Sequence, residues 1–380
     1  MLKIFQKKDL KKTYKDHLYA LILAGGGGTR LWPKSLERTP KQFLKIFDNK
    51  TLVEITGERL SKFLPWDKIF VVTTSKPYGD EIKKLLPKVP TENVLVEPER
   101  KDSAAAHALG AIYILNKDPE AVIINAASDH IVSPQLNYEK TMFAASKYAF
   151  ENNCLISIGI RPTYPHTGMG HLKKGEKVAV SEGRYVYKLD KFVEKPPLEI
   201  AKKYTESGDY FWNANHYVWR ADKFLDEVKN YAKTLYQGIE VIKENLGKSD
   251  EKGIIEREYK KFEKISIDYA ISEKSKNFFM IIADYGWTDI GDWNEVWKNL
   301  PKDVDGNVVI KGDEKGGEVI NIDTTDALIH SNGRLIAAID VDNLIIVDTK
   351  EALLVCSKSH AQSVKKIVEL LKDQGRKELL

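Results

Sequence analysis

Residues 21–44 combine an apolar run, a glycine cluster and two cations in an arrangement suited to binding phosphates. The Leu-Ile-Leu run at 21–23 predicts a buried strand. The glycines at 25–28 lack Cβ atoms, so their backbone N–H groups can approach bound oxygens closely. Arg30 and Lys41 add positive charge where a phosphoryl group needs it. The segment is therefore predicted to bind a polyphosphate.

Two common phosphate-binding loops do not fit this segment. A Walker A loop requires Gly-Lys-Ser/Thr after its spacer, and counting from Gly25 places Arg30 and Leu31 there. The dinucleotide fingerprint fails because Arg30 or Leu31 occupies the place of its third glycine. Glycines alone suit a tight turn without a ligand equally well. Arg30, Pro40, Lys41 and Gln42, in this fixed order, favour a ligand site.

The segment resembles the signature of the mannose-1-phosphate guanylyltransferases, also called GDP-mannose pyrophosphorylases, within the sugar-phosphate nucleotidyltransferases. That signature is similar to LAGGxGxRLWPxSxxxxPKQFL, which residues 23–44 match almost throughout, although Leu36 stands where arginine is frequent. Trp32-Pro33 and residues 40–43 favour this branch over the thymidylyl- and uridylyl-transferases. The resemblance implies catalytic roles for Arg30 and Lys41. It also implies nucleotide contacts from Leu23, Ala24, Gly25, Gly26, Gly28 and Thr29.

Two aspartates are candidate ligands of a divalent cation. Asp129 follows the apolar run AVIINAAS, and Asp289 lies in YGWTDIGDW, after a second strand-like run. Hard cations such as Mg²⁺ prefer carboxylate oxygens, but either aspartate alone suits a turn or a helix cap better. Both sit in elements similar to the family's. The resemblance implies that Asp129 and Asp289 bind Mg²⁺, that Ser128 contacts the nucleotide and that His130 is structural.

A further element is similar to one that supports the guanine base in the family. It reads EPERKDSAAAHAL, from Glu97. Glu97 can accept hydrogen bonds from N1–H and the exocyclic amine of guanine, which adenine cannot offer together. Asp102 stands where asparagine is usual and is expected at the nucleotide. Ser103 is predicted to cap the alanine-rich helix that follows.

The expected sugar site rests on three short elements. FVEKP resembles the family's Val-Glu-Lys-Pro motif, although such a sequence alone is an ordinary surface turn. The resemblance implies that Glu194 binds sugar hydroxyls, that Lys195 binds the sugar phosphate, and that Gly170 and Asn213 belong to the same pocket. The chain departs from the family pattern here, which leaves the identity of the sugar open, at Met169, His171, Asn215 and His216.

Apolar runs alternate with amphipathic stretches from residue 18 to about 160, which indicates βαβ units. Residues 18–300 are expected to form an α/β catalytic domain, Rossmann-like by resemblance, with a mixed, mainly parallel sheet. Ligands bind beyond the carboxyl ends of such strands. Residues 160–220 are interpreted as an antiparallel insert covering the site, and residues 221–246 and 253–275 as helices.

After Pro301 the chain changes to short β-rich runs separated by Gly, Asp and Asn. Residues 301–380 are therefore expected to form a small β domain of stacked short strands. The resemblance implies a left-handed β-helix. A final helix is predicted, with one apolar face formed by Val364, Ile367, Val368 and Leu371.

The net charge of +4 arises in a lysine-rich extension, residues 1–17, which holds six lysines and two aspartates. The rest of the chain has equal numbers of basic and acidic residues, so no nucleic acid partner is expected. No run of 18 apolar residues predicts an integral membrane segment. Cys154 and Cys356 lie far apart, which suits a reduced compartment, and a cytoplasmic protein is expected.

Taken with the resemblance, these motifs predict an enzyme that transfers GMP from GTP to α-D-mannose 1-phosphate, giving GDP-mannose and pyrophosphate. Two alternatives stay open: a GDP-sugar pyrophosphorylase for a different hexose 1-phosphate, and a non-catalytic subunit that senses nucleotide-sugar. Arg30, Lys41, Asp129, Lys195 and Asp289 disfavour the sensor, which would be free to lose them. The family also implies a possible homodimer through the C-terminal β domain.

Overall fold

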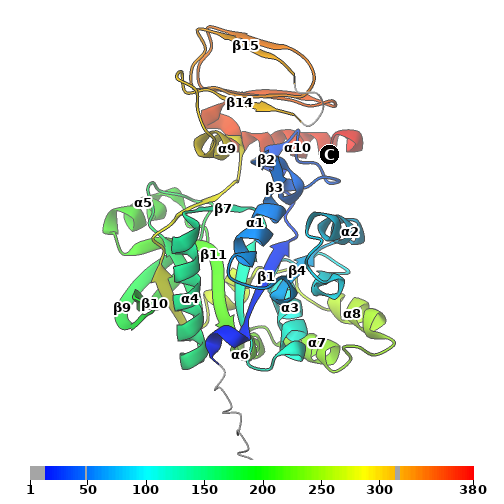
Figure 1. Cartoon of the computed structure of the whole chain (residues 1–380), viewed down its shortest axis with the longest axis vertical. Helices are drawn as coiled ribbons and strands as arrows, with labels where there is room; N and C mark the ends of the chain where they lie inside the picture. Colours follow the sequence, from blue (N-terminus) through cyan, green and yellow to red (C-terminus); the bar gives the residue numbers. More distant parts are fainter. Residues whose placement is uncertain (1–12, 48, 313–316) are drawn as a thin grey trace, which may run out of the picture.

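The computed structural model describes residues 13–47, 49–312 and 317–380. Figure 1 shows an α/β body, and above it a β-rich part whose terminal helix α10 lies along the top of that body. The α/β body is built on one sheet, and the β-rich part on stacked short strands. The expected α/β architecture with a β-helix-like C-terminal part is confirmed.

Among the described residues, nine strands form the central sheet in the order β5-β4-β1-β6-β11-β8-β12-β10-β9. Neighbours β5, β4, β1 and β6 are parallel, and β12 is parallel to β8. Strands β10 and β11 run against the others, so the sheet is mixed and mainly parallel, as predicted. The strands are β1 (Leu18–Ala24), β4 (Ile69–Thr73), β5 (Val94–Val96), β6 (Val122–Ala127), β8 (Leu155–Ile160), β9 (His171–Ser181), β10 (Arg184–Val193), β11 (Tyr210–Arg220) and β12 (Phe278–Ile282).

The hairpin of β9 and β10 belongs to this sheet and is not a separate insert. Strand β9 pairs with β10 and also with β11. The five strands β11, β8, β12, β10 and β9 therefore form a closed ring of neighbours. A small core of Leu172, Phe192, Phe211 and Met280 forms where these strands meet. The antiparallel pairing expected over residues 160–220 is therefore present, and it lies within the central sheet.

Helices cover both faces of the sheet, which explains why its strands are apolar on both sides. One face packs against α1 (Leu52–Ser61), α2 (Lys76–Leu85) and α4 (Gln135–Asn152). The other face packs against α3 (Ser103–Lys117), α6 (Ala221–Tyr231), α7 (Lys233–Lys243) and α8 (Glu251–Tyr259). A further helix, α5 (Leu198–Ser207), contacts β11.

The prediction of one helix over residues 253–275 is wrong. Helix α8 ends at Tyr259, and a single π-helical turn follows at Asp268–Ser272. Between them, Ile265 donates to the Lys101 carbonyl and accepts from the backbone N–H of Ala104. This segment is therefore non-helical because it uses its backbone groups to hold the start of α3.

The N-cap of α3 is Asp102, and the prediction of Ser103 in that role is wrong. The Asp102 carboxylate accepts from the Ser103 N–H at 2.7 Å, and its backbone has φ 68°. The Ser103 hydroxyl instead accepts from the Ile267 N–H at 2.9 Å. Both polar side chains at this turn are thus committed to fixing it.

The C-terminal part consists of short strands stacked in parallel. A four-stranded sheet has the order β14-β16-β18-β19, and β15 pairs with β17. Only the β18–β19 pair is antiparallel among the described strands of this part. These strands are β14 (Val308–Lys311), β15 (Val319–Ile322), β16 (Leu328–Ser331), β17 (Ile336–Ile339), β18 (Leu344–Asp348) and β19 (Leu353–Ser357).

The last helix, α10 (Val364–Asp373), and the short helix α9 (Trp293–Asn299) join this β part to the signature loop. Val364 and Val368 are buried, whereas Ile367 is 40% exposed, so the predicted apolar face of α10 is narrower than expected. One shared core packs these helices and strands β16 and β18 against the loop residues Leu31, Trp32 and Leu36. The loop of residues 25–44 is thus supported from both parts of the chain.

The predicted extension, residues 1–17, lies mostly outside the described residues. Its end, Tyr14–His17, forms a short 3-10 helix. His17 is buried and pairs with Asp118 at 2.9 Å, so these residues pack on the α/β part. Within the described ranges, no helix is both long and apolar enough to cross a membrane.

Candidate active site

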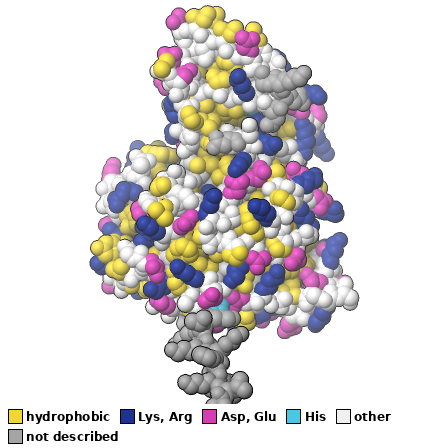
Figure 2. Space-filling model, viewed as in Figure 1, with side chains coloured by type: hydrophobic (Ala, Val, Ile, Leu, Met, Phe, Trp, Pro, Cys, Tyr) yellow, Lys and Arg dark blue, Asp and Glu magenta, His cyan; other side chains and the backbone are white. Residues whose placement is uncertain are grey.

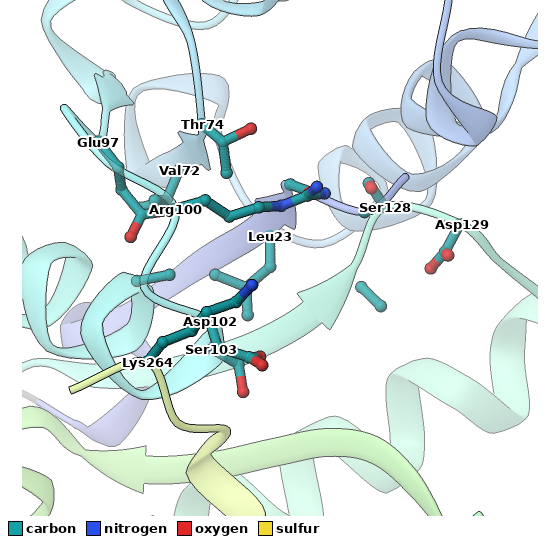
Figure 3. Close-up of a pocket in the computed structure, with 14 residues that line it drawn as sticks. Leu23, Val72, Thr74, Glu97, Arg100, Asp102, Ser103, Ser128, Asp129 and Lys264 are labelled. Carbon is teal, nitrogen blue, oxygen red and sulfur yellow. The ribbon is translucent and has the colours of Figure 1, made fainter. Parts of the chain in front are cut away.

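The carboxyl ends of four parallel strands meet at one edge of the sheet and line a cavity of about 450 Å³ (Figure 3). Strand β1 leads into the glycines, β4 into Thr74, β5 into Glu97 and β6 into Ser128. This is where ligands bind in sheets of this kind. Of the residues predicted at the nucleotide or metal, those that line it are Leu23, Gly25, Gly26, Glu97, Asp102, Ser128 and Asp129.

Three residues predicted at the nucleotide do not line this cavity: Ala24, Gly28 and Thr29. Ala24 is fully buried, and its carbonyl oxygen accepts from Gln42 and Thr73. Gly28 has φ 63°, and a Cβ there would lie 2.3 Å from the Lys41 Cβ. Glycine at 28 therefore lets the loop close onto Lys41. Thr29 begins the short 3-10 helix η2 (Thr29–Leu31), which also carries the exposed Arg30.

The two candidate metal ligands are brought together by a small strand pair. Strand β7 (His130–Ser133) is antiparallel to β13 (Gly286–Asp289), with His130 opposite Asp289. One ligand atom each from Asp129, His130 and Asp289 can lie within 4.8 Å of the others. Residues remote in sequence thereby form one candidate cation site at the end of the cavity.

Lys41 lies between the two carboxylates. Its Nζ is 2.9 Å from Asp129 Oδ2 and 2.5 Å from Asp289 Oδ1, and its side chain is buried. Although burial by itself lowers the pKa of Lys41, the two carboxylates raise it above its ordinary value overall. Burial likewise opposes ionisation of Asp289, but Lys41 holds the pKa of Asp289 at about 2. Lys41 and Asp289 are therefore both charged near neutral pH.

His130 is arranged as a supporting residue. The Trp287 indole N–H, which can only donate, points at His130 Nδ1 at 3.2 Å. A neutral His130 therefore carries its proton on Nε2, the atom nearest Asp129. Burial lowers the pKa of His130, so the neutral form is favoured. Protonated Nε2 has no lone pair and cannot bind a cation. The remaining ligands are the oxygens of Asp129 and Asp289, and oxygen ligands suit Mg²⁺.

The predicted sugar residues come together away from this cavity. A Cβ on Gly170 would lie 2.6 Å from Glu194 Oε2, and the Asn213 N–H donates to the Gly170 carbonyl at 2.8 Å. Lys195 Nζ donates to the Glu194 carboxylate. Burial and the negative charge of Asp268 raise the pKa of Glu194 above its ordinary value. The four residues therefore form one cluster around the ion pair of Lys195 and Glu194.

Both the nitrogen and the oxygen of the Asn213 side-chain amide already form hydrogen bonds within the protein. Its Nδ2 donates to the Tyr217 hydroxyl and to Asn215 Oδ1, both at 2.8 Å, and its Oδ1 accepts from Ser157 Oγ at 3.0 Å. The Tyr217 hydroxyl in turn donates to the buried Asp268 at 2.6 Å. A sugar hydroxyl can bind Asn213 only by exchanging with one of these partners.

The four departures from the family pattern lie around this cluster in different ways. Asn215 has φ 51°, a backbone conformation that asparagine adopts more readily than most residues. His171 and His216 are both fully buried, and His216 packs against His130 and Tyr285. Met169 is partly buried against the core. The two histidines are therefore buried inside the protein.

Glu97 is the buried carboxylate at the far end of the cavity from Asp129 (Figure 3). Burial raises its pKa to about 8, and the Tyr259 hydroxyl contacts its Oε1 at 3.3 Å. Near neutral pH the free carboxyl is therefore largely protonated. A ligand that donates to it favours the ionised form.

Several cavity residues were missed by sequence reasoning: Val72, Thr74, Arg100, Ser103, Ala106, Ala127 and Lys264. Arg100 lies in the EPERKDS element, where a cation next to Glu97 was a usable signal. Lys264 offered no signal, because it stands among many lysines and reaches the cavity through the non-helical segment after α8. The small apolar residues of the lining come from strand ends and α3.

Comparisons with known proteins identify the family of this chain. The family model described as Nucleotidyl transferase matches residues 19–306, and the one described as MannoseP isomerase/GMP-like beta-helix domain matches residues 317–371. The mannose-1-phosphate guanylyltransferase of Salmonella montevideo is 33% identical over 94% of this chain and 74% of its own length. The alginate biosynthesis protein AlgA of Pseudomonas putida is 32% identical over 94% of this chain and 72% of its own length.

A solved structure extends the likeness to the whole described fold. A Thermus thermophilus protein, described as a mannose-1-phosphate geranyltransferase, superposes with a TM-score of 0.82 at 27% sequence identity. The match covers 94% of this chain and 99% of that one.

Proposed function

The chain belongs to the nucleotidyl transferase family, among the mannose-1-phosphate guanylyltransferases, and from this we propose that it transfers GMP from GTP to α-D-mannose 1-phosphate. The products are GDP-mannose and pyrophosphate. The observation that carries the proposal is the convergence of Asp129, Asp289 and Lys41 at one end of a cavity that holds Glu97 at the other.

In this reaction a phosphate oxygen of the sugar phosphate attacks the α-phosphorus of GTP, and the bond to the bridging oxygen of the leaving pyrophosphate breaks. The attacking phosphate, with a second pKa of about 6, is already ionised near neutral pH, so no general base is needed. Catalysis then consists of alignment and charge stabilisation. Lys195 is assigned to the attacking phosphate, and Arg30 and Lys41 to the α-phosphate and the leaving group.

Asp129 and Asp289 are assigned as ligands of Mg²⁺, because their oxygens converge and His130 is not available as a ligand. Bound there, Mg²⁺ would neutralise charge on the phosphates. In the free protein Lys41 takes this place as the counter-charge of both carboxylates. The Lys41 ammonium is therefore expected to turn from the carboxylates toward the phosphates when substrates bind.

Guanine is assigned to the Glu97 end, and the sugar to the cluster of Gly170, Glu194, Lys195 and Asn213. Burial of His171 and His216 supports the sugar assignment, since these two departures from the family pattern are not accessible to a ligand in the structure. A GDP-sugar pyrophosphorylase for another hexose 1-phosphate stays the alternative. Comparing pyrophosphate release across several hexose 1-phosphates with GTP distinguishes the two.

We further expect a cytoplasmic homodimer. Both cysteines are free, which suits a reducing compartment. Figure 2 shows hydrophobic side chains gathered over the C-terminal β part, and Ile322, Ile339 and Val355 there are each more than half exposed. A second copy of the chain covering this surface would bury them. Light scattering on the purified protein tests the dimer.

The proposed reaction is tested by mixing the purified chain with Mg²⁺, GTP and mannose 1-phosphate. Pyrophosphate and GDP-mannose are expected in equal amounts, and neither when one substrate is omitted. A nucleotide-sugar sensor without activity would bind GDP-mannose and release no pyrophosphate.

A further inference from the structure

We propose that Arg100 contacts the nucleotide directly and binds the phosphates of GTP that leave as pyrophosphate. The inference rests on the function proposed above and adds a residue that its motifs do not assign. Arg100 lies in the turn between β5 and α3, three residues after Glu97, and lines the nucleotide cavity.

The position of the guanidinium is the first reason. One Arg100 Nη donates to the Gly25 carbonyl, and both Nη atoms lie 3.9 Å from the place where a Cβ on Gly27 would stand. In Figure 3 the side chain extends from the Glu97 end of the cavity toward Ser128. The guanidinium thus lies over the glycines, whose backbone N–H groups are expected to hold the phosphates.

The charge of the cavity wall is the second reason. Its described lining contains three acidic side chains, Glu97, Asp102 and Asp129, but only two cations, Arg100 and Lys264. A triphosphate brings several further negative charges into this space. Neither Lys41 nor Arg30, the two cations assigned above to the reacting phosphates, lines this cavity. Of the two lining cations, Arg100 is the one in contact with the glycine loop.

The freedom of the side chain is the third reason. Arg100 is exposed, and among the described residues its only hydrogen bond is the one to the Gly25 carbonyl. Guanidinium has five N–H donors in a planar fork that matches phosphate oxygens two at a time. It can therefore bind a phosphate with most of its donors while still lying on the loop.

The test compares ligands that differ only in their phosphates. Binding of GTP, GMP and inorganic pyrophosphate is measured by calorimetry on the wild-type chain and on Arg100→Gln. We expect Arg100→Gln to weaken GTP and pyrophosphate about 10- to 100-fold, as for the loss of charge-assisted hydrogen bonds, and GMP less than about twofold. Arg100→Lys should keep part of the affinity, because it retains the charge and loses the fork.

Lys76→Gln is the matched control, because it removes the same charge from the neighbouring helix α2, where Lys76 pairs with Asp80. It should leave all three affinities unchanged. Equal weakening of GTP and GMP by Arg100→Gln would overturn the inference, since it would mean that Arg100 only organises the loop. So would unchanged GTP binding. If the wild-type chain itself fails to bind GTP, the proposed function fails first.

Discussion

At the scale of single residues, Lys41 determines the electrostatics of the site. Its single positive charge offsets part of the negative charge of Asp129 and Asp289, and so it stabilises the convergence of the two carboxylates. Asp289 tests the metal assignment well. It lies on β13, which is remote in sequence from Asp129 and reaches the site by pairing with β7.

Asp289→Asn is expected to lower kcat about 100-fold or more and to raise the Mg²⁺ concentration needed for half-maximal rate, because an amide oxygen is a weaker ligand than a carboxylate. Pyrophosphate release measured against Mg²⁺ concentration checks this. Asp284→Asn serves as the control, since Asp284 pairs with Arg184 outside the site. An unchanged Mg²⁺ dependence in Asp289→Asn would remove Asp289 from the ligand set.

The raised pKa of Glu97 predicts a pH-dependent affinity for GTP. Guanine needs the ionised carboxylate, but below its pKa of about 8 the free carboxyl holds a proton that must be lost on binding. Affinity should therefore rise with pH by up to about tenfold per unit and level off above about pH 8. Titrations of GTP between about pH 6.5 and 8.5 test this. Glu97→Gln should bind weakly with no such rise; a similar rise in that variant would place the titration elsewhere.

At the scale of elements, the β1 loop depends on the close approach of Gly28 to Lys41. Gly28→Ala is expected to lower kcat at least about tenfold, because the new Cβ displaces the Lys41 backbone and its ammonium. It should also lower the free energy of unfolding by more than the roughly 1–2 kcal/mol that alanine costs in a left-handed backbone conformation without a steric clash. Gly247→Ala isolates that backbone cost, since Gly247 has φ 76° and open space around it. Steady-state kinetics and urea unfolding of both variants provide the comparison, and equal effects would contradict the close-approach argument.

Elements formed by interactions between residues close in sequence could be predicted. Elements formed by interactions between residues far apart in sequence could not. The strands β1, β4, β6 and β8 could be predicted, because a strand buried on both faces is a continuous apolar run in the sequence. The segment after α8 could not be predicted, because its backbone partners, Lys101 and Ala104, lie far away in sequence. Lys264 lies on this segment, so its place at the cavity was not predicted either. The cap expected at Ser103 is formed by Asp102, because the Ser103 hydroxyl binds the remote Ile267 N–H.

At the scale of the whole molecule, the C-terminal β part and the loop of residues 25–44 share one core. The Trp293 indole donates to the Trp32 carbonyl at 2.9 Å, and the Trp32 indole donates to the Leu379 carbonyl at 2.8 Å. Arg38 and Glu351 form an ion pair across the same junction at 2.6 Å. The family motif Trp-Pro in the loop is therefore explained by packing between the two parts, a role that the sequence alone did not indicate.

Trp293→Phe is expected to lower the free energy of unfolding by about 1–3 kcal/mol, since it leaves the buried Trp32 carbonyl without its donor and opens a cavity. Because the core is shared, unfolding should remain a single transition by both fluorescence and circular dichroism. Trp66→Phe, at a partly buried site at the edge of the α/β core, should cost less. Separate transitions for the two parts would show that the junction does not couple them.

The central claim is that this chain joins GTP and mannose 1-phosphate at the site formed by Asp129, Asp289 and Lys41. The most direct measurement is pyrophosphate release by the purified chain with Mg²⁺, GTP and mannose 1-phosphate, beside the double variant Asp129→Asn/Asp289→Asn. We predict rapid release that requires both substrates and falls to background in the double variant. Release at the same low level from both proteins would contradict the account.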